Sequence, residues 1–387
     1  MNTETSKVMF ALLRSAVCGG LLSSEEISLY SPDMLPEITS LAQKHDVIHL
    51  IVFALKKNGL LDESNKNLES KMLIAVYRLE KLNYGLTKLC GALEQAEVPF
   101  IPLKGSVLRQ YYPEPWMRTS CDIDVLVHAE NLKRTISYLT ELLGYSYESQ
   151  SSHDVSLFSK NRNHIELHYD ILGDNVIDSV EPVLKKMWDV AQKNDNRQYQ
   201  YKLPDEMFYF YHIAHMAKHF VETGGCGIRP FLDIWVLNHR IDFDREKRDK
   251  LLSDGGLSVF AKQAELLSEV WFGNAEHTKI TRQMEEYILR GGMYGTNTNR
   301  VAVQQQKKGG KVRYALSKIF IPYGKIKFHY PILQKHKWLT PIMEVRRWGK
   351  LIFCGHLKRT TKELKFNNNV SKKTAFETQE LLKNIGL

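Results

Sequence analysis

The chain has 387 residues, of which 25% are charged and 43% hydrophobic. These fractions are close to those of soluble globular proteins, and they exclude a wholly disordered chain and a collagen-like fibre. A chain of this length can bury a large core without disulfide staples and has room for about two or three domains.

The net charge of +9 is distributed unevenly. From Arg290 to the C-terminus there are 21 Lys and Arg against 4 Asp and Glu, a net charge of +17, whereas the preceding residues carry −8. A strongly basic C-terminal quarter indicates an anionic partner for that part: nucleic acid, a membrane surface or an acidic polymer such as a glycan. A solvated basic tail is the alternative.

Five scattered cysteines show no CxxC spacing. This argues against a zinc knuckle or a redox pair and favours a reducing compartment. The N-terminus lacks the basic and apolar segments of a signal peptide, and no run of about 18 apolar residues occurs. We therefore expect a cytoplasmic protein.

Residues 1–96 carry apolar side chains at helical spacing and form an N-terminal helical region. The predicted helices are Lys7–Val17, Pro36–His45, Val47–Lys57 and Leu68–Glu94.

Residues 97–200 have the pattern of an α/β unit, with strands of period two. The predicted elements are an edge strand at Pro99–Leu103, a helix over Val107–Tyr112, a strand over Asp122–His128, a helix over Glu130–Leu143, and strands over Asp154–Ser159 and His164–Tyr169. Asp122 and Asp124 share one face of their strand, as do Glu166 and His168 of theirs.

Helices return after this unit and make residues 201–295 a helical domain. The predicted helices are Glu181–Lys193, Asp205–Val221, Phe231–His239, Asp244–Leu252, Leu257–Trp271 and Thr278–Leu289. Residues 296–387 form a basic, aromatic-rich region. Its first part, Thr296–Gly310, is polar with glycines and predicts a linker or mobile loop, and the residues from Asn367 onward are expected to fray.

Gly105 and Ser106 lie between the first predicted strand and the following helix. A glycine there lets a ligand approach the backbone, and a helix N-terminus offers free N–H groups to an anion. The pair is a candidate phosphate turn, with a simple turn and helix cap as the alternative.

Three acids form the candidate catalytic cluster: Asp122 and Asp124 on one strand and Glu166 on another. Carboxylates packed together repel one another unless a cation lies between them, and hard oxygen ligands favour Mg²⁺ or Mn²⁺. The reaction that most needs such a cluster beside a phosphate turn is phosphoryl or nucleotidyl transfer, in which metal ions neutralise phosphate charge and activate the attacking oxygen.

The motifs between Pro102 and Asp170 resemble those of the DNA polymerase beta-like nucleotidyltransferase superfamily. They are Pro-Leu-Lys-Gly-Ser, then Arg118 and Ser120 ahead of Asp-Ile-Asp-Val-Leu-Val, then Ile-Glu-Leu-His. More closely, the chain is similar to the bacterial branch called uncharacterised nucleotidyltransferases, whose genes often lie near polysaccharide-synthesis loci. The resemblance implies an α/β (α+β) nucleotidyltransferase fold, a mixed sheet with flanking helices embedded between N-terminal and C-terminal helical regions.

The resemblance also implies roles for individual residues. Asp122 and Asp124 would bind both divalent metals, and Glu166 would ligate one of them and help to deprotonate the acceptor hydroxyl. The residues expected to bind the nucleotide triphosphate are Lys104, Gly105, Ser106, Arg118 and Ser120, of which Arg118 could instead steady the carboxylates.

A second candidate cluster follows on the predicted helix Asp205–Val221. His212, His215 and His219 share one face of it, Lys218 is adjacent, and Arg229 and Asp233 come soon after. In one interpretation this face closes over the nucleotide, with Lys218 or Arg229 toward the phosphates and a histidine toward the acceptor. In the other, these are buried polar residues bonded between helices, with Arg229 and Asp233 as an i, i+4 pair. Zinc at His215 and His219 lacks a further ligand of convincing spacing, and His168 could bond a carboxylate of the acidic cluster.

The sequence therefore predicts a Mg²⁺- or Mn²⁺-dependent nucleotidyltransferase that moves a nucleoside monophosphate from an NTP to a hydroxyl- or phosphate-bearing acceptor. The resemblance adds a link to polysaccharide synthesis. The alternatives are a non-catalytic nucleotide-binding or scaffold protein with the same fold, and a toxin–antitoxin-type transferase acting on tRNA or protein. The basic C-terminal region is expected to hold an anionic acceptor, an anionic membrane surface or a glycan, with nucleic acid less favoured.

Overall fold

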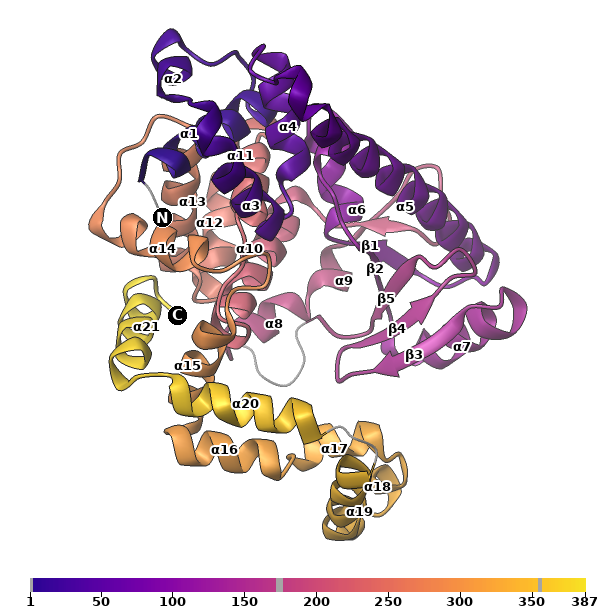
Figure 1. Cartoon of the computed structure of the whole chain (residues 1–387). Coiled ribbons are helices and arrows are strands. Elements are labelled where there is room, and N and C mark those ends of the chain that lie inside the picture. The colour runs from indigo at the N-terminus through magenta and orange to yellow at the C-terminus, as the bar shows by residue number, and fades with distance from the viewer. Residues whose placement is uncertain (1–2, 172–176, 354–356) are drawn as a thin grey trace.

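The computed structural model describes residues 3–171, 177–353 and 357–387. Figure 1 shows a helical body, a β-sheet beside it with α5 running along the sheet, and a C-terminal group of helices that forms a lobe below. Within the described residues, no helix has the length and apolar character needed to cross a bilayer.

The predicted N-terminal helices are present. They are α1 (Thr3–Val17), α3 (Leu35–Lys44), α4 (Ile48–Lys57) and the long α5 (Ser70–Gln95). A further short helix, α2 (Ser24–Leu29), lies between α1 and α3 and was not predicted from the sequence. A capping box fixes the start of α2, because the Ser23 and Glu26 side chains each bond the other's backbone N–H.

The five-stranded mixed sheet has the order β1-β2-β5-β4-β3. Its strands are β1 (Phe100–Pro102), β2 (Asp122–Val127), β3 (Ser146–Gln150), β4 (Asp154–Phe158) and β5 (His164–His168). β2 and β5 run parallel, and the other neighbouring pairs run antiparallel. The sheet confirms the predicted strands, and β1 lies at its edge as expected.

Alternation along β2 gives the sheet two different faces. Ile123, Val125 and Val127 are buried in a core with α5 and α7 (Leu132–Ser137). Asp122 and Asp124 face the opposite way, into a cavity toward α10 (Asp205–Glu222). The period-two pattern of the strand therefore decides which side chains meet the helical body.

The helix predicted over Glu130–Leu143 is α7 followed by a π-helical turn, Tyr138–Leu142. The helix predicted over Val107–Tyr112 is shorter and earlier: α6 spans Gly105–Leu108 and is followed by a 3-10 turn. The single helix predicted over Glu181–Lys193 is wrong. It is divided into α8 (Val180–Leu184) and α9 (Met187–Val190), and Lys193 belongs to β6 (Gln192–Lys193), which pairs with β7 (Tyr201–Lys202).

Five helices follow and confirm the predicted helical segment. They are α10, α11 (Arg229–Arg240), α12 (Arg245–Asp254), α13 (Ser258–Phe272) and α14 (Lys279–Leu289). They share one hydrophobic core with α1, α3 and α4, and Phe10 of α1 stacks on Trp271 of α13 with ring centroids 4.5 Å apart. The N-terminal helices are thus part of the body that faces the sheet.

The predicted linker over Thr296–Gly310 is wrong, because this segment forms α15 (Asn297–Lys308). Thr296 caps its N-terminus by accepting a hydrogen bond from the Asn299 N–H, and Gly309 ends it with φ of 77°. Val301 and Ala302 are fully buried against the C-terminal helices. The buried apolar side chains of this otherwise polar segment stabilise it as a helix.

The expected fraying from Asn367 onward is also wrong. Ser371 caps α21 (Lys372–Asn384), and Leu381 and Ile385 are buried in the main core. The rest of the C-terminal region consists of short helices: α16 (Lys311–Ile319), α17 (Tyr323–His329), α18 (Ile332–Lys335), α19 (Thr340–Phe353) and α20 (Leu357–Asn369).

Candidate active site

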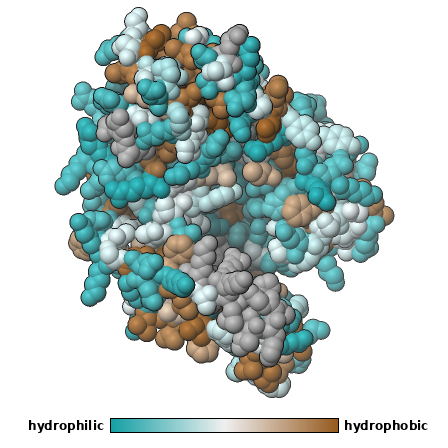
Figure 2. Space-filling view, viewed as in Figure 1, coloured by the Kyte–Doolittle hydropathy of each residue, from teal (hydrophilic) through white to brown (hydrophobic). Residues whose placement is uncertain are grey.

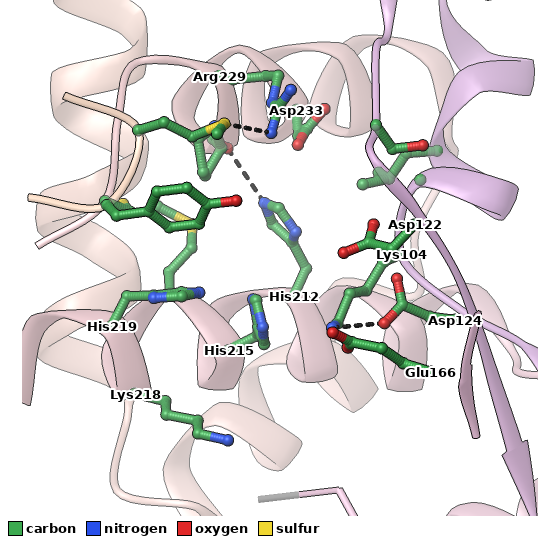
Figure 3. Close-up of a pocket in the computed structure, with 18 of the residues that line it drawn as sticks. Lys104, Asp122, Asp124, Glu166, His212, His215, Lys218, His219, Arg229 and Asp233 are labelled. Atoms are coloured by element: carbon green, nitrogen blue, oxygen red, sulfur yellow. Dashed lines mark hydrogen bonds and ion pairs between the residues drawn. The ribbon is translucent and has the colours of Figure 1, made fainter. Parts of the chain in front are cut away.

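A cavity of about 340 Å³ separates the acidic face of the sheet from α10 and α11. Almost every residue singled out from the sequence lines it. Those residues are Lys104, Gly105, Arg118, Ser120, Asp122, Asp124, Glu166, His168, His212, His215, Lys218, His219, Arg229 and Asp233. In Figure 3 the acids and Lys104 lie on one side and the histidines of α10 on the other.

Strand pairing brings the three acids together. Asp124 of β2 and Glu166 of β5 are direct partners in the parallel register. Asp122 lies two residues before Asp124 on the same face, opposite His164. Burial, followed by the charge of Asp124, raises the pKa of Asp122 to about 6. The neighbouring carboxylates of Asp124 and Glu166 therefore oppose the ionisation of Asp122.

Lys104 places a cation among these acids. Its Nζ lies 2.6 Å from Asp124 Oδ1 and 3.6 Å from Glu166 Oε2. Burial alone would lower the pKa of Lys104, but the carboxylates, Asp124 above all, raise it well above its usual range. The backbone of Lys104 has φ of 47°, a conformation that L-residues rarely adopt. The chain thus holds a strained residue at the point where its ammonium neutralises the acidic cluster.

His168 joins the cluster from the end of β5. Its Nε2 lies 2.9 Å from Asp124 Oδ1 and 3.5 Å from Glu166 Oε2. Burial and Lys104 lower the pKa of His168, but its hydrogen bonds to the two acids raise it above the usual value. Although burial raises the pKa of Glu166, the His168 hydrogen bond and Lys104 hold it below the ordinary value. His168 therefore helps to keep Glu166 ionised.

Gly105 begins α6 directly under the cavity. A Cβ at this position would lie 2.9 Å from Cβ and Oγ of Ser120, so Gly105 is required for the close packing of the two segments. Arg109 locks this contact by donating to the Gly105 carbonyl at 2.8 Å and to Ser120 Oγ at 3.0 Å. Ser106 faces away: it lines a second pocket on the far side of α6, where its buried hydroxyl has no partner among the described residues.

Arg118 and Asp233 form a buried pair between the α/β unit and α11. Arg118 Nε lies 2.6 Å from Asp233 Oδ1 and Nη2 lies 2.9 Å from Oδ2, while the Tyr112 hydroxyl donates to Oδ1 at 2.7 Å. Asp233 is fully buried. Burial would raise the pKa of Asp233, but Arg118 outweighs it and holds this pKa below its usual value.

Arg229 pairs with a residue that the sequence analysis missed. Its Nη1 lies 2.6 Å from Asp46 Oδ2 and 3.0 Å from the Thr119 carbonyl. The interpretation of Arg229 and Asp233 as an i, i+4 ion pair is therefore wrong, because each bonds a partner from another part of the chain. Asp46 follows α3 and has a positive φ. No pattern in its local sequence predicts the contact with Arg229.

The helix face opposite the acids is lined by neutral histidines. Burial lowers the pKa of His212, His215 and His219, that of His219 to about 4. His212 bonds the Pro230 carbonyl at 3.1 Å and His219 bonds Thr223 Oγ1 at 3.1 Å. Lys218 points into the same cavity, with its Nζ 3.3 Å from His153 Nε2. This side of the cavity therefore presents neutral imidazoles and one ammonium group to a bound ligand.

Two overlapping groups of side chains could hold a divalent metal. They are Asp122, His164 and Glu166, and Asp124, Glu166 and His168, and in each group the ligand atoms lie within 4.8 Å of one another. Glu166 belongs to both. The carboxylate-rich donor set suits Mg²⁺ or Mn²⁺, and Nε2 of His168 faces Asp124 and Glu166 as a possible nitrogen ligand. These residues therefore fit a divalent cation, which would share the carboxylates with Lys104. Within the described chain, neither group includes His215 or His219.

His153 and His164 were missed as candidate site residues. His164 shares its strand face with Glu166 and His168, so the same period-two argument could have found it. His153 precedes β4, and its ring lies 6.2 Å from that of His168. Only the antiparallel pairing of β4 with β5 brings it there, and no sequence signal marks it.

Comparison of the sequence with known protein families identifies one family that matches this chain. The family model described as "Uncharacterised nucleotidyltransferase" matches residues 32–273, which is more than half of the chain. The chain belongs to the uncharacterised nucleotidyltransferase family. The matched segment contains α4 and α5, the sheet, α10 and α11, and so every residue that lines the cavity except Met293 and Tyr294. Membership confirms the nucleotidyltransferase fold expected from the motifs.

The remaining comparisons add little to the family assignment. No curated protein matches the chain. Among solved structures, a CCA-adding enzyme from Thermotoga maritima in complex with tRNA is 12% identical, and the match covers 81% of this chain and 84% of that one. Its TM-score is 0.21, so this likeness carries no argument about fold or substrate.

Proposed function

We propose that this member of the family is a divalent-metal-dependent nucleotidyltransferase that moves a nucleoside monophosphate from an NTP to a hydroxyl- or phosphate-bearing acceptor. Family membership supports nucleotidyl transfer in general. The observation that carries the proposal is the alignment of Asp124 with Glu166 across parallel strands, with Asp122 on the same face and the cavity open beside them.

Asp122, Asp124 and Glu166 would hold the metal, with His164 and His168 able to add a nitrogen ligand. A bound divalent cation would neutralise phosphate charge and lower the pKa of an attacking oxygen. The chain itself contributes positive charge on the opposite wall, where Lys218 and Arg229 can bind phosphate oxygens. The neutral imidazole of His215 can accept a proton from an acceptor hydroxyl that enters between them.

One observation favours the second candidate function, a nucleotide-binding protein without catalysis. The ammonium of Lys104 already lies between Asp124 and Glu166, where a catalytic cation would be needed. If the ammonium stays there permanently, the fold can bind a nucleotide without transferring it.

A binding assay run beside a transfer assay separates the two functions. Calorimetry with each non-hydrolysable NTP should show binding that requires Mg²⁺ or Mn²⁺ and is abolished by EDTA. Incubation of the protein with an α-labelled NTP and cell extract should transfer label to an acceptor and release pyrophosphate. Binding without transfer would support the non-catalytic function, and absence of binding would contradict both. Label on tRNA would identify the acceptor as nucleic acid, and label on a glycan or lipid carrier would support the link to polysaccharide synthesis.

The position of Lys104 makes a separate prediction about cation affinity. In Lys104→Met the ammonium that lies 2.6 Å from Asp124 is removed, so a divalent cation meets three carboxylates with less competing charge. We expect Mn²⁺ to bind about tenfold more tightly or better in the absence of nucleotide. Titration followed by electron paramagnetic resonance measures this without relying on activity. Lys88→Met, which removes an exposed lysine of α5, is the matched control. Unchanged or weaker Mn²⁺ binding in Lys104→Met would show that Lys104 and the cation do not share a site.

A further inference from the structure

The C-terminal lobe exposes an apolar stripe on α16. Val312, Leu316 and Phe320 are spaced four residues apart, so they lie on one side of the helix and the residue that ends it. Their exposed fractions range from 47% to 73%. A row of large apolar side chains in water is unfavourable for a protein that acts alone.

A second stripe follows on the segment that leads into α19. Trp338, Ile342 and Val345 again have helical spacing, and each is more than half exposed. The apolar residues needed for the lobe's own folding are separate: Ile326, Leu333 and Met343 form its small buried core. The residues of the two stripes therefore do not belong to the buried core of the lobe. Figure 2 shows brown, apolar atoms along the lower rim of the molecule, where these helices lie in Figure 1.

The segment that carries both stripes is strongly basic. Between residues 311 and 350 there are ten Lys and Arg and a single acid, Glu344. Glu344 is itself occupied, because its carboxylate accepts from Arg347 Nε at 2.9 Å and from the Ile321 N–H at 2.7 Å. The segment from residue 311 to residue 350 thus combines exposed apolar side chains with many cations and a single acid that is already paired.

We propose that the C-terminal lobe docks on an anionic lipid bilayer. Helices with an apolar face that includes Trp and Phe, bordered by Lys and Arg, bind in the interfacial region of membranes and are attracted to anionic headgroups. The two stripes insert below the headgroups, and the surrounding lysines and arginines contact lipid phosphates. This docking does not depend on the proposed transferase activity.

The composition of the stripes favours lipid over other occupants. RNA would be held by aromatic side chains that stack on bases, whereas four of the six exposed residues are aliphatic. A second copy of the chain, packed through the same patch about a twofold axis, would place one strongly positive lobe against another. An anionic bilayer satisfies both the apolar and the charged parts of this surface.

Vesicle binding by the full chain tests the proposal. We expect cosedimentation with vesicles of phosphatidylcholine containing phosphatidylglycerol, at least about tenfold weaker binding to phosphatidylcholine alone, and weakening of the binding by salt. The double variant Phe320→Ser/Trp338→Ser, with one change in each stripe, should lose at least about tenfold in vesicle affinity.

The matched control is Leu73→Ser/Tyr77→Ser, which removes two equally exposed apolar side chains from α5, far from the lobe in sequence. It should bind vesicles as the unchanged protein does, and circular dichroism should show that both variants are folded. Failure of the unchanged protein to bind anionic vesicles, or equal binding by the Phe320→Ser/Trp338→Ser variant, would overturn the proposal. So would lipid-independent dimerisation that this variant abolishes, or RNA that displaces the vesicles and binds more tightly.

Discussion

Asp122→Asn is expected to reduce nucleotidyl transfer by more than about 100-fold while the protein stays folded. Asparagine keeps the shape of the side chain but removes the charge that a divalent cation requires. The same loss is expected for Asp124→Asn, whose carboxylate is the common partner of Lys104 and His168. Pyrophosphate release under saturating Mg²⁺ and NTP measures the effect.

The Asp122 variant should also gain stability. Burial and Asp124 raise the pKa of Asp122 from 3.8 to about 6. Because the folded-state pKa lies above that of the unfolded chain, the cost of ionising Asp122 grows as the pH rises from about 4 to 6 and is fully present above about 6. A neutral side chain removes this cost, so the free energy of unfolding at pH 7.5 should rise by about 1–2 kcal/mol. The gain should shrink as the pH falls from about 6 toward 4 and disappear at about pH 3, where Asp122 is protonated in both the folded and the unfolded protein.

Asp170→Asn is the matched control for both measurements. Asp170 follows β5 and is exposed, and it belongs to neither group of candidate metal ligands. Transfer and stability should match those of the unchanged protein. Full activity in Asp122→Asn would remove this residue from the catalytic cluster, and a loss of stability at pH 7.5 would contradict the electrostatic account of its pKa.

The acidic cluster could be predicted because the strand pattern is local. Period-two alternation puts Asp122 and Asp124 on the same face of β2, and it puts Glu166 and His168 on the same face of β5. Apolar neighbours such as Ile123 show that the opposite face packs against the core. The parallel pairing that sets Asp124 beside Glu166 is a tertiary result. The motifs suggested it only through their resemblance to a family that has this arrangement.

The long-range partners could not be predicted from local patterns. Asp46 meets Arg229 across 183 positions and Arg118 meets Asp233 across 115, and their spacing in the sequence carries no periodic signal. The position of the Lys104 ammonium was likewise invisible, because it depends on a strained backbone between β1 and α6. Helix α15 was missed for a different reason: its polar composition outweighed its three buried apolar residues, Val301, Ala302 and Val303.

Arg118→Ala is expected to lower the free energy of unfolding by about 3–5 kcal/mol, the largest effect on stability that we predict. The change leaves the buried Asp233 carboxylate with the Tyr112 hydroxyl as its remaining hydrogen-bond partner among the described residues. A side chain that is fully buried in the folded protein has then lost its countercharge. Urea unfolding followed by circular dichroism measures the loss, and Tm should fall with it.

A double variant distinguishes a buried ion pair from a side chain that contributes only through packing. In Arg118→Met/Asp233→Leu both charges are removed together, so no unpaired charge remains and the stability should exceed that of Arg118→Ala. Lys185→Ala removes a charge from the exposed pair with Glu181, and Tm should stay the same, because solvent screens that pair. If Arg118→Ala unfolds at the same urea concentration as the unchanged protein, the pair does not hold α11 against the α/β unit. If the double variant is no more stable than Arg118→Met alone, the unpaired charge of Asp233 does not account for the loss.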